Sequence, residues 1–597
     1  MSIIEPVLDV RHLSIELKTD GAWKTIVQPL SFAIRPGETL ALVGESGSGK
    51  SVTAYGIMQL LPALHSRIRG SIAFQGRDLL TLGTKQMQDI RGNRIGMIFQ
   101  EPMSSLNPVL TIGTQITEVL KRHRGMDNRA ARQEAIRLLE RVRISSAASR
   151  LDAYPLHFSG GMRQRVVIAI ALACQPDLLI ADEPTTALDV TVQAEILTLI
   201  QTLQREENMA ALFITHDMGV VAEVADKVLV MNQGQGLEMS DTRSLFQHPR
   251  HPYTRKLIEA VPRLGDMRGI SAPMAFNTTQ PQPDTVQPGK PVLQVNDLCQ
   301  RFPVRSGWMR RITKEVHAVD RVSFDLQPGE TLGLVGESGC GKSTLAKTIM
   351  RLLEASDGKV VLEQQDLLGA NPLQLAAMRR RIQLIFQDPW ESLNPRMRIG
   401  DALAEPMLAH GLVTADQADQ AVADLLQSVG LAAEMASRFP HQFSGGQRQR
   451  VCIARALALK PSVIIADESV SALDVSVRAE IINLLMDIQR SQGIGLLFIS
   501  HDMAVVERIS HRVAVMYQGK IVEIGSRQAV LETPAHPYTQ HLLSAVPIPD
   551  PDYQRPALKP FPKPQLTEWP INQRLPPLRY LEVAKGHKVL VDGAGEE

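Results

Sequence analysis

The sequence GESGSGKS occupies residues 44–51, and GESGCGKS occupies residues 336–343. Each follows a short apolar run, TLALV or TLGLV, which is typical of a buried strand. In such a loop the glycines let backbone N–H groups approach a phosphate, the lysine adds positive charge, and the final serine reaches Mg²⁺. Two loops in one chain therefore predict two nucleotide sites.

The two loops are part of an internal duplication. FQEPMSSLNP at residues 99–108 returns as FQDPWESLNP, and FSGGMRQR at residues 158–165 returns as FSGGQRQR. The stretches IADEPTTALDV, FITHDM and HPYT return in the same order, and the HPYT stretches at His251 and His536 are 285 residues apart. A repeat of this length is a whole domain.

Two Pro-rich stretches separate and follow these domains. Such composition is typical of extended linkers, because it offers few apolar side chains for a core. We predict a first domain at residues 1–262, a linker at 263–291, a second domain at 292–547 and a tail at 548–597. The end of the tail, EVAKGHKVLV, contains a short strand-like run.

Composition argues against several classes of partner and location. The 597 residues carry a formal net charge of +1, so we expect no nucleic-acid partner. Apolar runs such as VVIAIALAC are shorter than the roughly 20 residues that cross a bilayer, and the N-terminus lacks the pattern of a secretory signal. We therefore expect a cytosolic chain, with its four scattered cysteines present as reduced thiols.

Each copy has an α/β pattern. The runs DLLIADE and ALFITHD are typical of buried parallel strands that present polar residues at their carboxyl ends. Helical patterns begin at the loop lysines and are expected over residues 50–61 and 342–353. Residues 101–158 are mostly helical by periodicity, which predicts a separate helical subdomain.

Adjacent acidic residues follow one of these strands in each copy. We expect Asp182 and its equivalent Asp467 to hold Mg²⁺ through water. Glu183 and Glu468 are the candidate general bases for an attacking water molecule. Without a preceding phosphate loop, such a pair is more often solvated surface charge.

Three further motifs are candidates for contact with the nucleotide. His216 and His501 follow a strand and are candidates for contact with the γ-phosphate, and Gln100 and Gln387 are candidates for contact with Mg²⁺ or the attacking water. Ser-Gly-Gly opens a helical pattern in each copy, and helix N-terminal N–H groups suit a γ-phosphate. Each motif in isolation has an ordinary structural explanation, such as an N-cap.

Taken in order, these motifs resemble those of the ATP-binding cassette (ABC) ATPases, and the likeness covers almost the whole chain twice. The resemblance implies two tandem nucleotide-binding domains of α/β class, each with a RecA-like core sheet and a helical subdomain. It also implies ATP and Mg²⁺ as ligands, transport-coupled ATP hydrolysis, and head-to-tail packing in which the Ser-Gly-Gly segment of one copy closes the site of the other.

The resemblance therefore implies two composite sites. The first combines Gly44, Ser46, Gly47, Gly49, Lys50, Ser51, Val52, Gln100, Asp182, Glu183 and His216 with Ser444, Gly445, Gly446 and Gln447. The second combines Phe302, Gly336, Ser338, Gly339, Gly341, Lys342, Ser343, Thr344, Gln387, Asp467, Glu468 and His501 with Ser159, Gly160 and Gly161.

Three positions depart from the family pattern. Met162 stands where the family usually has Gln, and Ser-Val follows Glu468 in place of Pro-Thr. At the adenine-stacking position the second copy has Phe302, whereas the first has Leu17, with Trp23 as a possible substitute. Both sites keep their glutamate and histidine, so we expect both to hydrolyse ATP with different adenine affinities.

The HPYT elements resemble the C-terminal region of ATPases that serve oligopeptide, dipeptide and nickel importers, although HPYT also fits a helix start with Pro in the first turn. The resemblance implies import of glutathione or another short peptide. It implies two membrane permease subunits and an extracytoplasmic binding protein as partners, and a peripheral location on the cytoplasmic face of the inner membrane. The chain itself is not expected to touch the transported substrate.

Other functions fit the sequence less well. Another importer substrate stays open. A ribosome-associated tandem ATPase would have a long charged helical linker, and a DNA-repair ATPase would carry heptads or paired cysteines. An exporter is a closer alternative, but HPYT and EPMSSLNP favour import. Because the tail lacks a cysteine cluster, we expect no iron–sulfur cluster.

Overall fold

The computed structural model divides the chain into two units, each described here by itself. Unit 1 comprises Met1–Val261 and Pro547–Pro556, and unit 2 comprises Pro262–Val546 and Ala557–Glu597. The structure describes all residues except 1–4, 20, 102–104, 187, 277, 279–284, 307–310, 472, 557, 559–560, 563–565, 572, 574–575 and 592–597, and it does not describe the side chains of residues 306, 311 and 391. The domain boundaries inferred from the sequence stay a prediction.

Unit 1 is built on a mostly parallel sheet whose strand order is β10-β9-β3-β8-β7-β6. Its central strands are buried along their whole length, which explains their continuous apolar sequences. The strands of this sheet are β3 (Thr39–Val43), β6 (Ile95–Ile98), β7 (Leu178–Asp182), β8 (Ala210–Thr215), β9 (Lys227–Asn232) and β10 (Gln235–Asp241).

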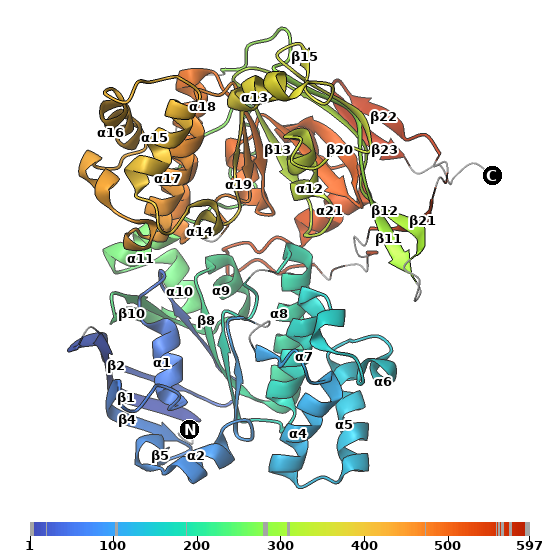
Figure 1. The fold of residues 1–597 in the computed structure, drawn as a ribbon. Coiled ribbons are helices and arrows are strands. Elements are labelled where there is room, and N and C mark those ends of the chain that lie inside the picture. The colour runs from blue at the N-terminus through green and yellow to red at the C-terminus, as the bar shows by residue number, and fades with distance from the viewer. Residues whose placement is uncertain are drawn as a thin grey trace. The chain divides into compact units, whose positions relative to one another are not determined.

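A second sheet of unit 1 is antiparallel, and α1 packs against its strands β1 and β2 (Figure 1). Its strands are β1 (Leu8–Thr19), β2 (Ala22–Ile34), β4 (Ser66–Phe74) and β5 (Arg77–Asp78). The helices are α1 (Lys50–Ile57), α2 (Thr84–Ile90), α4 (Ile112–Arg124), α5 (Asn128–Arg141), α6 (Ala147–Arg150), α7 (Gly160–Leu172), α8 (Val190–Glu207), α9 (Met218–Val224), α10 (Thr242–Gln247) and α11 (Pro252–Glu259), with 3₁₀ turns at Leu79–Thr81 and Pro155–His157.

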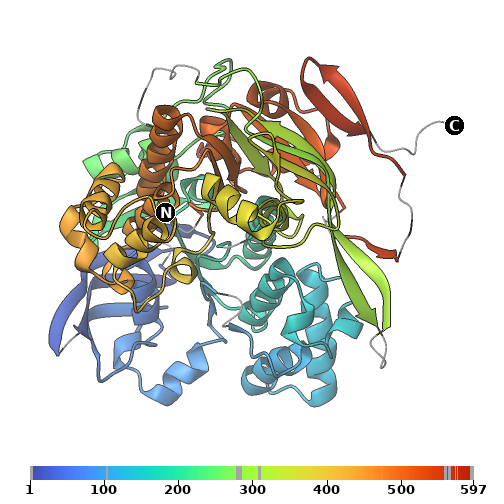
Figure 2. The ribbon, with the colours of Figure 1, turned by 45° about the horizontal axis from the view of Figure 1, so that its top comes forward.

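The predicted helical subdomain is present. Helices α4, α5 and α6 lie beside α7 and away from the strands, as Figures 1 and 2 show from two sides. They share one apolar cluster with α7 and α8, which includes Ile116, Leu138 and Val166. This cluster explains the helical periodicity between residues 101 and 158.

Unit 2 repeats this plan and extends both sheets with strands from the tail. The strand orders are β16-β17-β18-β13-β19-β20-β23-β22 and β15-β14-β11-β12-β21. The strands are β11 (Leu293–Ser306), β12 (Arg311–Leu326), β13 (Thr331–Val335), β14 (Asp357–Leu362), β15 (Gln365–Asp366), β16 (Ile382–Ile385), β17 (Val463–Asp467), β18 (Gly495–Ile499), β19 (Arg512–Tyr517), β20 (Lys520–Ser526), β21 (Glu568–Pro570), β22 (Arg579–Ala584) and β23 (His587–Val591).

The helices of unit 2 follow the order of those in unit 1. They are α12 (Lys342–Ile349), α13 (Pro372–Arg381), α14 (Pro389–Ser392), α15 (Ile399–Ala409), α16 (Ala418–Ser428), α17 (Gly445–Leu457), α18 (Val475–Gln492), α19 (Met503–Ile509), α20 (Arg527–Glu532) and α21 (Pro537–Ser544), with 3₁₀ turns at Ala433–Ser437 and Pro440–Gln442. The strand-like run expected near the end of the tail is confirmed as β22 and β23.

The helices after the two loops are shorter than predicted. They end at Ile57 and Ile349, where helical patterns over residues 50–61 and 342–353 were expected. Gln59 and Arg351 adopt positive φ angles of 49° and 52° two residues after these ends. A left-handed residue cannot continue a right-handed helix, so the chain turns there.

The segment that follows the first copy is part of unit 2 and is partly buried in it. Met267, Met274 and Phe276 are buried there. The backbone N–H of Phe276 donates to Asn483 Oδ1 at 2.7 Å, and the Arg508 guanidinium lies 4.8 Å from the centre of the Phe276 ring. A few apolar side chains therefore hold this polar stretch in place.

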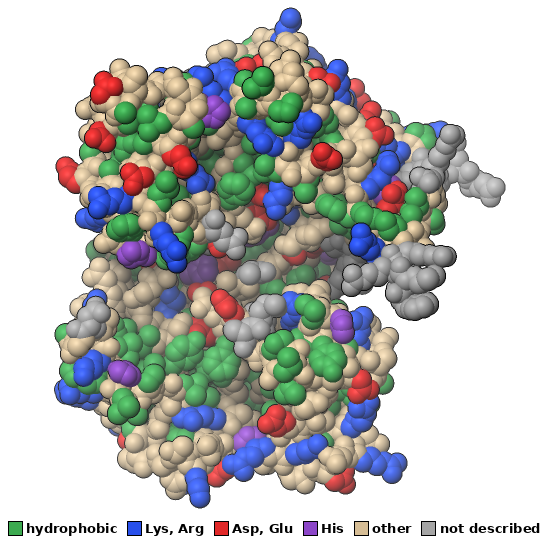
Figure 3. All heavy atoms as spheres, in the orientation of Figure 1, with side chains coloured by type: hydrophobic (Ala, Val, Ile, Leu, Met, Phe, Trp, Pro, Cys, Tyr) green, Lys and Arg blue, Asp and Glu red, His purple; other side chains and the backbone are tan. Residues whose placement is uncertain are grey.

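Charged side chains of both signs share the surface of the molecule. Lys and Arg side chains are interspersed with Asp and Glu on the face shown in Figure 3. Within the described residues, no helix has the length and apolar character needed to span a membrane. The four cysteines are buried free thiols, as expected.

Candidate nucleotide-binding sites

Both phosphate loops connect a central strand to a helix. The first loop joins β3 to α1, and the second joins β13 to α12. Gly44 has a φ of 152°, and a Cβ there would lie 2.1 Å from the carbonyl oxygen of Met231. Gly336 has the same constraint, at 2.3 Å from the oxygen of Met516. Only glycine fits at these positions, so the loops are held close to the adjacent strands.

The loop lysines point back along the loop. Lys50 Nζ donates to the carbonyl oxygens of Gly44 and Glu45 at 2.7 and 2.9 Å. Lys342 Nζ donates to Gly336 and Glu337 at 2.7 and 3.0 Å. Both lysines are buried, so each ammonium group is a concentrated positive charge inside its loop.

A hydroxyl and a carboxylate meet beside each loop. Ser51 Oγ donates to Asp182 Oδ1 at 3.0 Å, and Ser343 Oγ donates to Asp467 Oδ1 at 3.1 Å. Burial raises the pKa of Asp182 to about 6 and also raises the pKa of Asp467. A buried carboxylate beside a hydroxyl is a donor set that suits Mg²⁺, whose charge would favour the ionised form.

In the first copy, Gln100, Glu183 and His216 converge as predicted. Gln100 Nε2 donates to Glu183 Oε2 at 3.0 Å, and His216 Nδ1 lies 3.1 Å from Glu183 Oε1. Burial alone would raise the pKa of Glu183, but His216, Thr186 and Lys50 together lower it to about 2. The carboxylate is therefore ionised at neutral pH and held by groups from three segments.

Thr186 is a site residue that the sequence analysis missed. Its Oγ1 donates to Glu183 Oε2 at 2.8 Å. Its position three residues after Glu183, in a turn, is the feature of the sequence that could have identified it. In the second copy Ser471 occupies this place and donates to the carbonyl oxygen of Glu468 instead.

The second copy assembles the same three groups with a looser histidine. Gln387 Nε2 donates to Glu468 Oε2 at 2.8 Å, whereas His501 Nδ1 lies 3.7 Å from Glu468 Oε1. Lys342 Nζ lies 3.9 Å from the same oxygen. Burial alone would raise the pKa of Glu468, but His501 and Lys342 together lower it below its usual value. This carboxylate is therefore also ionised at neutral pH.

The Ser-Gly-Gly segments begin α7 and α17. Ser159 Oγ accepts the N–H of Met162 at 3.4 Å, and Ser444 Oγ accepts that of Gln447 at 3.3 Å. Gln447 Oε1 also accepts the N–H of Ser444 at 3.0 Å, which completes a capping box. Met162 has no oxygen for this second bond, so the departure from the family residue weakens the cap in the first copy.

The two glycines of each segment have different roles. A Cβ on Gly161 would lie 2.5 Å from Val192, and one on Gly446 would lie 2.3 Å from Val477, so close helix packing requires glycine there. Gly160 has no atom within 4 Å of such a Cβ, and Gly445 has only a side-chain contact at 3.8 Å. Packing does not explain these first glycines, which favours a role in anion binding.

The candidate adenine-stacking residues lie on paired strands. Phe302 is 39% exposed on β11, opposite Val316 of β12. Leu17 lies on β1, and the guanidinium of Arg67 covers the Trp23 ring at 3.9 Å. An arginine on the ring face competes with adenine for Trp23. The stacking roles stay a prediction.

The HPYT elements form capped helix starts with Pro in the first turn, which was one of the two explanations of this motif. His251 is the N-cap of α11 and accepts the N–H of Tyr253, and Pro252 is in the first turn. The Glu238 carboxylate accepts the backbone N–H groups of Arg250 and His251, both at 2.9 Å. His536 and Glu523 repeat this arrangement at α21.

Comparisons with known proteins agree with this geometry. The family described as "ABC transporter" matches residues 27–186 and 319–471. The chain belongs to the ABC transporter family. The predicted fold class, two α/β ABC cassettes, is thereby confirmed, as is the assignment to transport-coupled ATPases. The family described as "Oligopeptide/dipeptide transporter, C-terminal region" matches residues 237–291 and 522–569, which include both HPYT elements of the ABC cassettes.

Full-length relatives extend the match. The glutathione import ATP-binding protein GsiA of Pectobacterium atrosepticum is 55% identical over 561 residues, which cover 91% of this chain and 90% of the relative. The protein of the same name from Escherichia coli K12 is 55% identical over 566 residues, covering 92% and 91%. The resemblance to ATPases of the oligopeptide and dipeptide importer group is confirmed.

Proposed function

We propose that the chain is the ATP-hydrolysing subunit of a binding-protein-dependent importer for glutathione or another short peptide. The observation that carries this proposal is the convergence of Gln100, Glu183 and His216 beside a phosphate loop, repeated at the second loop. The oligopeptide/dipeptide transporter C-terminal region in both copies and the names of the relatives support a short peptide as the transported substrate.

The chemistry follows from the described contacts. The loop N–H groups and Lys50 bind the phosphates of ATP. Glu183 is ionised and accepts the proton of the attacking water, while Gln100 and His216 hold its carboxylate on opposite oxygens. Glu468, Gln387 and His501 act in the same way in the second copy.

Ser51 with Asp182, and Ser343 with Asp467, are the pairs that would hold Mg²⁺. The cation would supply neutralising charge on the phosphates. Glu183 and Glu468 lie next to these aspartates in the sequence but are not part of the Mg²⁺-holding pairs. Each is therefore available to accept the proton of the attacking water.

We further propose that Ser159 and Ser444 each complete the site of the other copy. Their exposed helix N-termini suit the γ-phosphate, and the first glycine after each serine has no packing requirement. ATP binding would then close the two copies, and hydrolysis would reopen them.

Membrane subunits are the partners that this proposal requires. A cavity of about 640 Å³ lies between α13 of the core and the end of α15 of the helical part, lined in part by Met378, Arg381 and His410. The same two helices carry exposed leucines outside the cavity: Leu373 on α13 is 85% exposed and Leu408 on α15 is 41% exposed. A cavity with exposed apolar residues on the helices that line it supports docking of a permease segment there.

Two experiments test the proposal. Expression with and without the two permease subunits should move the chain to the membrane fraction only when they are present; an equal distribution would contradict the transporter assignment. Cells lacking the chain should fail to use external glutathione as a sulfur source while still using sulfate. Normal growth on glutathione, with no second importer, would shift the substrate to other short peptides.

A further inference from the structure

The second phosphate loop is contacted by the tyrosine of the second HPYT element. Tyr538 is 0% exposed, in the first turn of α21. Its hydroxyl oxygen accepts the backbone N–H of Glu337 at 3.2 Å, and its O–H lies 3.5 Å from Glu337 Oε2, to which it donates. The two residues are 201 positions apart, so the fold alone brings this helix to the loop.

Glu337 is the point at which the loop backbone is fixed. Its carbonyl oxygen accepts a hydrogen bond from Lys342 Nζ at 3.0 Å, while its N–H donates to Tyr538. The preceding Gly336 lies against the carbonyl oxygen of Met516. The N–H groups that must converge on a phosphate follow directly, so their direction depends on how residues 336 and 337 are held.

The C-terminal tail covers Tyr538. The ring of Phe561 lies 5.6 Å from that of Tyr538 and 5.3 Å from that of His541, measured between centroids. Tyr517 lies 4.3 Å from Tyr538, and its hydroxyl donates to the carbonyl oxygen of Pro562 at 3.0 Å. These four rings form an aromatic cluster (Tyr517, Tyr538, His541 and Phe561) between the tail and the phosphate loop.

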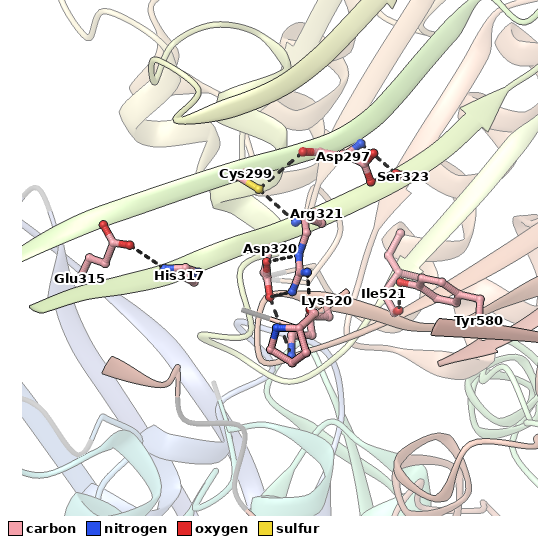
Figure 4. A network of polar contacts seen from close by, with 11 residues as sticks. Asp297, Cys299, Glu315, His317, Asp320, Arg321, Ser323, Lys520, Ile521 and Tyr580 are labelled. Carbon is pink, nitrogen blue, oxygen red and sulfur yellow. Dashed lines mark hydrogen bonds and ion pairs between the residues drawn. The ribbon is translucent and has the colours of Figure 1, made fainter. Parts of the chain in front are cut away.

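Further contacts attach the tail to unit 2. Strand β21 pairs with β12. Figure 4 shows Asp320 and Arg321, both on β12, joined by an ion pair; the Arg321 side chain also donates to the carbonyl oxygen of Pro576 at 2.6 Å. In the same view Tyr580 donates to the carbonyl oxygen of Ile521 at 2.7 Å, and burial raises its pKa to about 12. The described residues of the tail after Pro556 are therefore a structured part of unit 2.

One of these contacts reaches the HPYT element directly. His587 Nε2 of β23 lies 2.7 Å from Glu523 Oε1. The Glu523 carboxylate also accepts the N–H groups of Ala535 and His536 at 2.8 and 3.1 Å, which fixes the turn before Tyr538. The tail thus supports this turn from one side and the tyrosine ring from the other.

The two copies differ at this point. Glu337 is 5% exposed, whereas the equivalent Glu45 is only half-buried. Tyr538 is fully buried, whereas the equivalent Tyr253 is only half-buried. Residues 557–591 belong to unit 2, so the cover over the tyrosine is a property of the second copy.

We propose that Tyr538 is a positioning residue for the second nucleotide site, and that the C-terminal tail sets the nucleotide affinity of that site through Phe561. The proposal rests on the proposed function only in taking the loop of residues 336–343 as an ATP site. It makes the tail a determinant of unequal affinity between two otherwise similar sites.

The test measures nucleotide affinity at one site of the full chain. A Lys50→Ala background disables the first loop, and binding of trinitrophenyl-ATP with Mg²⁺ then reports the second. Tyr538→Phe keeps the ring and removes the hydroxyl with both of its hydrogen bonds to Glu337, so affinity should fall about two- to tenfold. The hydrolysis rate at saturating ATP and the thermal midpoint without nucleotide should change little.

Matched variants separate this role from general damage. Phe561→Ala should weaken binding in the Lys50→Ala background but not at the first site, measured in a Lys342→Ala background. Tyr517→Phe removes the hydrogen bond to Pro562 but keeps its ring, so it should weaken binding less than Phe561→Ala. Phe561→Leu keeps apolar cover and should retain most of the affinity.

Equal affinity of Tyr538→Phe and its parent would overturn the positioning role. Equal weakening of both sites by Phe561→Ala would overturn the assignment of the tail to the second site. The proposed function is judged separately, by whether the Lys50→Ala chain binds nucleotide at all.

Discussion

The Nδ1 atom of His216 lies 3.1 Å from Oε1 of Glu183, within hydrogen-bond distance, whereas the equivalent atoms of His501 and Glu468 are 3.7 Å apart. The contact between the histidine and the carboxylate is therefore closer in the first copy than in the second. If Glu183 and Glu468 are the general bases, Glu183→Gln and Glu468→Gln should each still bind ATP and lower hydrolysis at the altered site by roughly 10²- to 10⁴-fold. Steady-state hydrolysis and nucleotide trapping measure the two effects.

The size of the single-mutant effect also tests coupling between the copies. If each site needs both copies, either variant should fall far below half of the parent activity. The exposed Glu206 offers a matched control, since Glu206→Gln should leave hydrolysis unchanged. Retention of about half the activity in each variant would mean that the two sites work separately.

Because the pKa of Asp182 is raised, the stability of the chain without a bound cation should depend on pH. Burial moves this pKa from 3.8 to about 6, so the folded chain holds its proton more tightly than the unfolded chain. The stability that results is full below pH 4 and is lost as pH rises through 6. Asp182→Asn lacks this dependence.

Without Mg²⁺ and nucleotide, the unfolding free energy of the parent should therefore fall relative to that of Asp182→Asn by about 2–3 kcal/mol between pH 4 and pH 7. Urea unfolding in EDTA at several pH values measures this difference. Asp89→Asn, on the surface, should run parallel to the parent. Parallel curves for Asp182→Asn as well would show that burial does not raise this pKa.

The sequence was a good guide to what is repeated and local. The loops, the strands ending at Asp182 and Asp467, and the convergence of Gln100 with Glu183 follow from motifs whose spacing reflects one chemistry. A parallel sheet brings these strand ends to one edge, so residues far apart in sequence meet there.

Contacts made by polar and Pro-rich segments could not be predicted in this way. Met267 and Phe276 are buried within unit 2 because the fold places other residues of that unit against them. The composition of a polar segment does not reveal such contacts. The bond between Tyr538 and Glu337 likewise depends on where the fold places α21. The αL turns at Gln59 and Arg351 left no periodic signal, so the helices after the loops were predicted too long.

The carboxylate of Glu238 should be essential for the turn before α11. It accepts two backbone N–H groups, so Glu238→Ala leaves both without their acceptor and should lower the stability of unit 1 by about 1–3 kcal/mol. Glu238→Gln keeps one acceptor oxygen and should lose less. Chemical unfolding followed by probes in unit 1 compares the two; equal losses would mean that the side chain packs and does not cap.

The segment of residues 547–556 should depend on one ion pair for its attachment to unit 1. The Arg555 guanidinium lies 2.7 Å from Glu223 Oε2 on α9, and both side chains are largely buried. Arg555→Ala leaves the Glu223 carboxylate buried without its cation, so we expect a loss of about 1–3 kcal/mol and faster proteolysis within the segment. Adding Glu223→Gln to this variant removes the buried charge and should recover part of the stability.

Arg243, whose ion pair with Asp552 is exposed, provides the control, because Arg243→Ala should change stability by less than about 0.5 kcal/mol. Limited proteolysis and thermal unfolding of the full chain measure both effects. If Arg555→Ala and Arg243→Ala behave alike, the apolar contact of Pro547 with Gly219 holds the segment and the ion pair does not.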